Sequence, residues 1–276
     1  ALESEVTQVR LNVTTTAQDE NSVTYDISLK DLDGNDVDIV SGKTVTVKLY
    51  VGPYLKNVQV KHGDTPMSED DYEYNPATGY LTIHTSSFSK FEVTFENMQA
   101  EVDKYGVIYA ENGTILLSAR DLPDDVTEYA VRPGVKMIFP YAFAYNLNLT
   151  RVTLPESLEE IGDYAFNECK SLAAVNLGEA TNLKKIGNRA FRYCFSLTTL
   201  ALPPALTEIG PAAFMGCVTL EGPLTIPASV TRIEDQTFEV CYKLKGINLS
   251  EGITYIGKNA FKSCESITEL TIPASV

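Results

Sequence analysis

The stretch LTIPASV at residues 224–230 decides the fold, because the same seven letters return at residues 270–276. The two copies are 46 residues apart, and a shorter period of about half that length runs through the chain before them. Phenylalanines mark this period at steps of 23 to 25 residues, at Phe143, Phe166, Phe191, Phe214, Phe238 and Phe261. A fixed period of this length indicates a repeat protein whose units stack on one another.

Each unit divides into two halves that differ in the spacing of their apolar residues. The first half of the second unit follows one face of a short helix, at Ile161, Ala165, Phe166 and Cys169. The second half alternates, with Val175 and Leu177 separated by Asn176, which is typical of a strand. No single unit can enclose its own apolar residues, whereas stacked units bury them in one column. We therefore predict a solenoid over residues 131–276, with about six units of roughly 23 residues, each a short strand plus a short helix.

The unit resembles the leucine-rich repeats of the BspA-like, Treponema pallidum type, whose pattern is C-x-x-L-x-x-[VI]-x-[LI]-P-x-x-[LV]-x-x-I-G-x-x-A-F. The pattern recurs over six units between residues 131 and 276. Residues 99–130 look like the hairpin-bearing segment that caps such arrays, with Asn112-Gly113 as the turn. The resemblance implies a leucine-rich repeat solenoid in a bacterial protein that is secreted or held at the cell surface, with its targeting peptide already removed before Ala1.

Residues 1–98 lack this period and show the alternation of strands. Runs such as SVTYDISL and KTVTVKLYV alternate apolar with polar residues and are separated by turn residues. Six or seven such runs predict an all-β sandwich. Residues 72–95, YEYNPATGYLTIHTSSFSKFEVTF, are similar to the closing strands of immunoglobulin-like modules on bacterial surface proteins, which implies an Ig-like domain over residues 1–98.

Composition and motifs argue against several classes of function. The net charge of −15 disfavours nucleic acid and anionic lipid surfaces, and no apolar run is long enough to span a membrane. His62 and His84 have no Cys or His neighbour at metal-ligand spacing, and the acidic run 31–38 fits a hairpin turn better than a calcium loop. Gly-rich phosphate loops and a nucleophile elbow are absent from the sequence. We therefore expect no catalytic residues, no cofactor and no metal.

The five cysteines occupy one position of the repeat. They follow the phenylalanine by three residues, at Cys169, Cys194, Cys217, Cys241 and Cys264, and Asn146 takes this place in the first unit. Small side chains with weak S–H donors suit a buried column. We therefore predict reduced and stacked thiols, although neighbouring units also bring α-carbons into disulfide range.

The residues that favour protein binding lie on the helical side of the predicted solenoid. Outward strand positions are small and weakly polar, for example Thr153, Asn176 and Ala201. Interface hot spots are enriched in Trp, Tyr and Arg. Such residues give the candidate partner site, which consists of Tyr164, Arg189, Arg192, Tyr193, Phe195 and Tyr242.

Three interpretations of the function follow. The first is an adhesion or recognition protein that binds host matrix, glycan or partner-cell ligands through its solenoid, as the resemblance implies. The second is a structural stalk or spacer, and the third is a polysaccharide-active enzyme, which would need two converging carboxylates. The final LTIPASV lacks the half-unit that covers its first copy. We therefore expect that the array continues beyond Val276 or that another molecule contacts this open C-terminal end.

Overall fold

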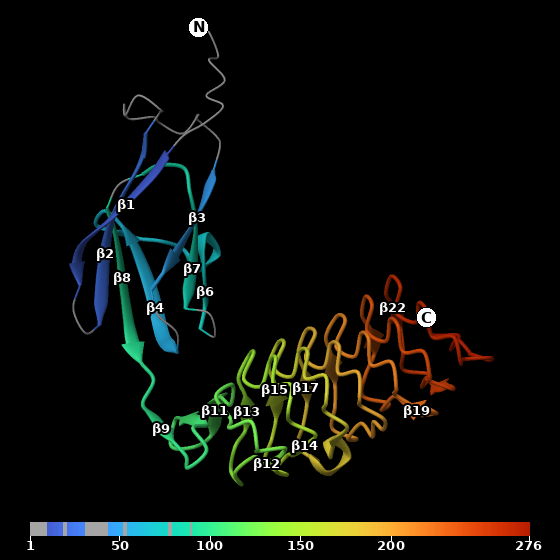
Figure 1. Cartoon of the computed structure of the whole chain (residues 1–276). Helices are drawn as coiled ribbons and strands as arrows, with labels where there is room; N and C mark the ends of the chain where they lie inside the picture. The colour runs from blue at the N-terminus through green and yellow to red at the C-terminus, as the bar shows by residue number, and fades with distance from the viewer. Residues whose placement is uncertain (1–9, 19–20, 31–43, 52–53, 77–78, 89) are drawn as a thin grey trace, which may run out of the picture. The chain divides into compact units, whose positions relative to one another are not determined.

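The computed structural model describes residues 10–18, 21–30, 44–51, 54–76, 79–88 and 90–276. The chain divides into two compact units, Ala1–Met98 and Gln99–Val276. Both units are built from strands (Figure 1), and the described residues contain two short 3₁₀ helices and no α-helix. The acidic run 31–38, predicted to be a hairpin turn, lies outside the described residues.

The first compact unit consists of two antiparallel sheets. The larger sheet has the strand order β1 (Arg10–Gln18), β2 (Ser22–Lys30), β8 (Lys90–Asn97), β4 (Leu55–His62) and β5 (Thr65–Pro66). The smaller sheet has the order β3 (Val45–Tyr50), β7 (Tyr80–Thr85) and β6 (Tyr72–Asn75), with the 3₁₀ helix η1 (Glu69–Asp71) directly before β6. Alternation of apolar and polar residues gives each strand one buried face, as in β7, where every second side chain is buried.

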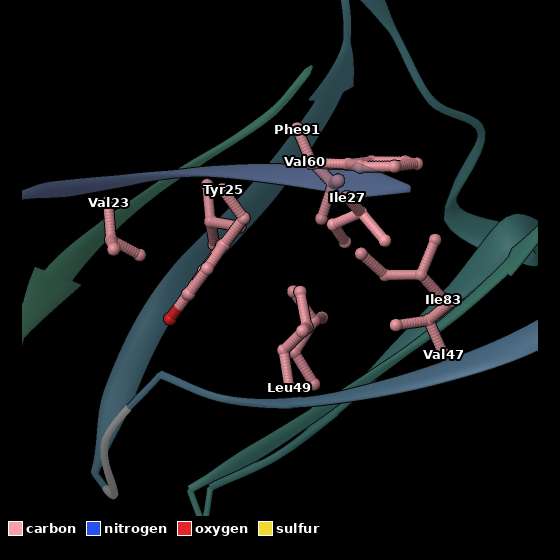
Figure 2. Packing of buried hydrophobic residues seen from close by; sticks show 10 residues of the cluster. Val23, Tyr25, Ile27, Val47, Leu49, Val60, Ile83 and Phe91 are labelled. Atoms are coloured by element: carbon pink, nitrogen blue, oxygen red, sulfur yellow. The ribbon is translucent and has the colours of Figure 1, made fainter. Parts of the chain in front are cut away.

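The core of the first compact unit lies between its two sheets. Ile27 and Phe91 of the larger sheet point toward Val47 and Ile83 of the smaller one (Figure 2), and all four are at most 1% exposed. Tyr25 reaches across and donates a hydrogen bond from its Oη to the Tyr50 carbonyl over 3.0 Å. Two sheets packed face to face form a β-sandwich. The immunoglobulin-like character of this unit stays a prediction.

The second compact unit is a β-solenoid whose turns lie side by side (Figure 1). It opens with three antiparallel strands, β9 (Ala100–Val102), β10 (Ile108–Ala110) and β11 (Ile115–Ser118), of which β10 and β11 form the capping hairpin. Parallel strands then continue this sheet, namely β13 (Met137–Ile138), β15 (Glu160–Ile161), β17 (Lys185–Ile186) and β18 (Glu208–Ile209). In the last units β20 (Arg232–Ile233) pairs with β22 (Tyr255–Ile256).

A second row of parallel strands forms the other side of the solenoid. It contains β12 (Glu128–Ala130), β14 (Arg151–Thr153) and β16 (Ala174–Val175), and then β19 (Leu224–Thr225) paired with β21 (Ile247–Asn248). The 3₁₀ helix η2 (Leu177–Glu179) follows β16. The strands of this row that lie in units one, two, four and five fall where the alternating half of the repeat predicted them. Residues 199–202 of the third unit form no strand, so the row is interrupted there.

The prediction of a short helix in each unit is wrong. The isoleucines assigned to helix starts, such as Ile161, lie in short strands. The residues after them form overlapping turns, in which Ala142, Ala144 and Asn146 donate their N–H groups to carbonyls three residues back, over 3.1 Å in each case. These turns replace the predicted helices.

Hydrogen bonds between units explain why the turns do not become helical. The N–H groups of Tyr141, Phe143 and Tyr145 donate to carbonyls of the next unit, over 2.8 to 3.0 Å. An α-helix would pair every N–H group with the carbonyl four residues back. Tyr141 and Tyr145 also have φ values of 62° and 66°, the left-handed conformation that a type II turn requires and a helix excludes. Neighbouring units therefore take the hydrogen bonds that a helix would have formed locally.

A column of phenylalanine rings fills the core of the solenoid. Neighbouring rings from Phe143 to Phe261 are stacked, with centroids 4.8 to 5.9 Å apart and planes within 9° of each other. The first five rings are fully buried, whereas Phe261 is half-buried in the last unit. Ile272 and Val276 are about half exposed, whereas their counterparts Ile226 and Val230 are buried under the following unit.

The cysteines form a second column beside the rings. Each Sγ donates to the carbonyl of the phenylalanine one unit before, over 3.0 to 3.3 Å, as from Cys169 to Phe143. All five thiols are free, and only Cys264 is not fully buried. Burial raises the pKa of Cys169 and of Cys217 to about 12, because the thiolate would lose its hydration. In the first unit Asn146 Oδ1 instead accepts from the Leu149 N–H group over 2.9 Å.

We predict that truncating a central ring costs far more stability than truncating the last one. Phe191→Ala removes a fully buried ring with stacked neighbours on both sides, and we expect a loss of about 3–5 kcal/mol in the free energy of unfolding. Phe261→Ala, its matched control, should cost less because that ring is half-buried. Urea denaturation of the full chain measures both. Equal losses would contradict a core column that is closed in the middle.

We also predict that the stability falls as the pH rises from about 8.5 toward 12. An unfolded cysteine has a pKa near 8.5. The unfolded chain therefore releases protons in this range that folded Cys169 and Cys217 keep. Each buried thiol should lower the free energy of unfolding by up to about 1.4 kcal/mol per pH unit. Urea denaturation at pH 7.5 and at pH 10 measures this change.

Cys217→Ala separates the thiols from the lysines and tyrosines that titrate in the same range. It should make the dependence on pH shallower by one thiol. Under native conditions the four buried thiols should also resist a thiol reagent that modifies all five in denaturant. Two disulfides and one free thiol would contradict the column.

Candidate functional site

The overlapping turns form one edge of the solenoid. We call this edge the turn edge and define it as residues 139–147 of the first unit with their equivalents, which are residues 162–170, 187–195, 210–218, 234–242 and 257–265. Each of these segments has two left-handed residues four positions apart, as at Tyr141 and Tyr145. Because the same conformation recurs in every unit, equivalent side chains of neighbouring units lie in rows along this edge.

The first row joins aromatic and arginine side chains across units. The rings of Tyr141 and Tyr164 are stacked, with centroids 4.7 Å apart. The guanidinium group of Arg189 lies 5.5 Å from the centroid of Tyr164, and its Nη1 donates to the Tyr164 Oη over 2.7 Å. On the other side, Arg120 donates from Nε to the Tyr141 carbonyl over 3.0 Å. Tyr164 and Arg189 therefore bind each other and support the stacking of units.

An exposed apolar cluster lies further along the turn edge. Phe195 is 38% exposed, and its ring centroid is 5.7 Å from that of Tyr193. Arg192 holds Tyr193 in place, because its guanidinium group is 4.1 Å from the ring centroid and its Nη2 donates to the Tyr193 Oη over 3.0 Å. Tyr242, 42% exposed, occupies the position of Phe195 two units later.

Val218 lies between Phe195 and Tyr242 in the order of the repeat units. These three residues directly follow Cys194, Cys217 and Cys241, so they occupy the same turn position in three successive units. Since neighbouring strands are about 4.8 Å apart, the row spans roughly 10 Å. We call Tyr193, Phe195, Val218 and Tyr242 the apolar strip.

A smaller apolar spot lies in the first unit and is separated from the strip. Tyr145 and Leu147 are 57% and 54% exposed there. In the second unit the equivalent residues are Glu168 and Lys170, which form an ion pair of 3.4 Å. Charged residues therefore divide the exposed apolar surface of the turn edge into two parts.

The six candidate residues chosen from the sequence all lie on the turn edge but have different roles. Arg189 pairs with Tyr164, and Arg192 orients Tyr193. Phe195 and Tyr242 are the exposed members of the set. The sequence-based choice missed Leu147 and Val218. Their position directly after the Asn or Cys of the repeat is the signal that could have identified them.

The strand side of the solenoid carries two hollows. An apolar one of about 590 Å³ lies where the strand row is interrupted, and its lining includes Leu200, Leu202, Pro204, Pro223 and Pro227. A polar one of about 460 Å³ lies near the capping hairpin and is lined by residues between Asp103 and Thr153. The rest of the outward strand positions are small, as the sequence indicates.

Two carboxylates near the end of one unit, Glu159 and Glu160, are paired with lysines. Glu159 lies 3.0 Å from Lys184 and 3.6 Å from Lys136, and the hydrogen bond to Lys184 lowers the pKa of this carboxyl. Glu160 forms an ion pair of 3.1 Å with Lys185. These pairs run along the seven-stranded sheet and connect successive units.

The two histidines occupy surface positions of the first compact unit, the β-sandwich. His84 shares a hydrogen bond of 3.0 Å with Thr46 through its Nδ1, and His62 stacks on Phe91 with centroids 4.4 Å apart. Among the described residues, no group of three or more His, Cys, Asp or Glu could hold a metal ion. Within the same part of the chain, no helix has the length and apolar character needed to cross a membrane.

Comparisons with known proteins agree with this geometry. The model of the BspA type leucine rich repeat region matches residues 136–222 and 179–276 in six copies. A solved structure of a leucine rich cell surface protein from Faecalibacterium prausnitzii A2-165 is 26% identical, with a TM-score of 0.54, and the match covers 64% of this chain and 55% of that one. Among curated proteins, none matches the chain.

Two further solved structures are similar. A leucine-rich repeat protein from Eubacterium ventriosum ATCC 27560 is 26% identical over 65% of this chain and 53% of its own, with a TM-score of 0.47. The Leucine Rich Repeat protein of T. pallidum is 25% identical over 62% of this chain and 88% of its own, with a TM-score of 0.44. This chain thus spans about half the length of the Faecalibacterium and Eubacterium proteins that it matches.

We predict that Gly216→Ala disturbs the apolar strip and lowers stability. A Cβ atom at Gly216 would lie 2.4 Å from Cδ1 of Tyr193, and the φ value of +76° disfavours any side chain. Tyr193 should therefore be displaced, with a loss of about 1 kcal/mol or more in the free energy of unfolding. Gly134→Ala is the matched control, because Gly134 also has a positive φ, of +92°, but no atom within 4 Å of the added Cβ. NMR shifts of the Tyr193 ring should change only in Gly216→Ala, and unchanged shifts would contradict the contact.

Proposed function

Because the chain belongs to the BspA-type leucine-rich repeat family, we propose that it is the recognition part of a bacterial adhesion protein, secreted or held at the cell surface. Its partners in this proposal are proteins or glycans of a host matrix or of other bacterial cells. The solenoid supplies the binding surface, since solenoids bind through extended faces that their stacked units create. The likeness to a cell surface protein of Faecalibacterium prausnitzii supports the location.

The observation that carries this proposal is the apolar strip. Phe195 and Tyr242 expose large apolar surface at equivalent positions, with Val218 between them. Aromatic residues and arginine dominate the energy of protein interfaces. Arg192 holds the Tyr193 ring in place, and a preorganised side chain loses less entropy on binding.

The charge of the chain restricts the partners. The formal net charge is −15, which repels nucleic acid and anionic membranes at long range. A protein partner with an apolar groove rimmed by basic residues would fit both the strip and this charge. We do not propose catalysis, because a glycosidase needs two free carboxylates at close range, and Glu159 and Glu160 are held by lysines.

A structural stalk is the second candidate function. The regular stacking and the small residues on the strand side favour it, because a spacer needs length and stiffness without a binding surface. The two candidates differ in one measurable respect. A recognition module loses affinity when the strip is changed, whereas a stalk has no affinity to lose.

We predict that Phe195→Ser and Tyr242→Ser each weaken partner binding by about 2 kcal/mol, or roughly thirty-fold in Kd. The full chain is immobilised and tested against a panel of purified host matrix proteins and intact bacterial cells. Tyr255→Ser is the matched control, because Tyr255 is 36% exposed but lies on β22, outside the strip. Equal binding by all variants would contradict the role of the strip. No binding by the parent chain would favour the stalk.

A further inference from the structure

The polar hollow on the strand side is a second candidate for ligand binding, far in sequence from the apolar strip. Its volume of about 460 Å³ lies within the range of small-molecule pockets. Three parts of the chain line it. The loop after β9 contributes Asp103, Lys104 and Tyr105, strand β12 and the residues after it contribute Glu128, Tyr129, Ala130 and Arg132, and strand β14 contributes Arg151 and Thr153.

A hydrogen-bond network connects the residues on one side of the hollow and is buried where Tyr109 meets Tyr129. The Tyr129 hydroxyl donates to Asp103 Oδ2 over 2.7 Å and lies 2.5 Å from the Tyr109 hydroxyl. Burial raises the pKa of Tyr129, so that this hydroxyl keeps its proton. Asp103 Oδ1 accepts from the N–H groups of Tyr105 and Val107 over 2.8 and 2.9 Å. The network fixes the loop that carries Lys104 and Tyr105.

The walls carry polar groups that have remaining hydrogen-bonding capacity. Arg151 and Glu128 are more than half exposed, and their closest atoms are 3.5 Å apart, which leaves the other nitrogens and the second oxygen open to a ligand. Within the described part of the chain, no side-chain hydrogen bond engages the Thr153 hydroxyl. Lys104 lies 4.5 Å from the ring centroid of Tyr105, which is 36% exposed. Donors, acceptors and an aromatic ring therefore face one small space.

The charges around the hollow balance and so favour a neutral ligand. Lys104, Arg132 and Arg151 line the hollow together with Asp103 and Glu128, and Glu101, just outside the lining, forms an ion pair of 2.6 Å with Arg132, so that three cations are matched by three carboxylates. A bound anion would be repelled by the carboxylates of Glu128 and Asp103 and by the negative net charge of the chain. An apolar ligand would leave these polar groups unpaired, which costs free energy. A ligand with several hydroxyl groups can accept from Arg151 and donate to Glu128 at the same time.

We propose that this hollow binds a neutral saccharide unit, with Arg151, Glu128 and Thr153 bonded to its hydroxyl groups and Tyr105 against its ring. Rings of tyrosine offer an apolar face to the C–H groups of a sugar, and planar arginine and carboxylate groups match neighbouring hydroxyls. The inference rests on the glycan part of the proposed function and deepens it, because it names a separate site and narrows the ligand class to neutral saccharides. It does not depend on the apolar strip.

The test is a titration of the full chain with methyl glycosides of glucose, galactose, mannose and N-acetylglucosamine, followed by saturation-transfer NMR. We expect at least one neutral glycoside to bind saturably, with affinity reduced tenfold or more in Arg151→Ala and in Tyr105→Ser. Arg232→Ala and Tyr255→Ser are matched controls, since they change an exposed arginine and a tyrosine that is 36% exposed like Tyr105, both away from the hollow and from the apolar strip. Both controls should bind the glycoside like the parent chain.

Three results would overturn the inference. The first is the absence of binding by a folded parent chain, and the second is equal loss in the control variants. The third is binding of glucuronic acid or of a free peptide terminus in place of the neutral glycosides. Protein-partner binding through the apolar strip would be unaffected by Arg151→Ala. Failure of the saccharide site and failure of the proposed function are therefore distinguishable.

Discussion

The hydrogen bond from each phenylalanine N–H group to a carbonyl of the next unit is the interaction on which the solenoid depends. It recurs at all five unit interfaces, from Phe143 to Ala165 and onward to Phe238 and Ala260, over 2.7 to 2.9 Å. Because it joins the turn edge of every unit to the next, it places the rings and the thiols in register. At position 187 the close approach of neighbouring units also requires glycine, since a Cβ atom there would lie 2.6 Å from the backbone nitrogen of Asp163.

This constraint places irregularity on the strand side. The turn edge keeps its geometry in all six units, whereas extra residues of the longer units appear around Gly178 and Pro223, beside the strand row. Residues 199–202, between these two insertions, form no strand, and the apolar hollow lies beside them. The regular edge orders side chains in rows, as in the apolar strip. The less regular side provides hollows.

The helix prediction failed for a reason that lies in the hydrogen bonds. Ile161, Ala165, Phe166 and Cys169 have the spacing of a helix face, but a strand followed by overlapping turns buries the same four residues without a helix. The sequence gives no local sign of this difference, because the left-handed residues include Tyr141, Arg189 and Val240, which are not typical of that conformation. Contacts between units select the left-handed turns, since these let alternate N–H groups donate to carbonyls of the neighbouring repeat unit.

The sequence by itself determined the period, the number of units, the residues of the two core columns and the edge that carries the aromatic candidates. Each of these follows from residue types that recur at fixed positions, because apolar side chains at those positions are buried wherever another unit covers them. Only the tertiary structure decided that Tyr164 and Arg189 bind each other and that Arg151 and Tyr105 line one hollow. These contacts join residues 20 to 50 positions apart. They depend on how side chains of neighbouring units meet, and the local spacing of residues does not encode that geometry.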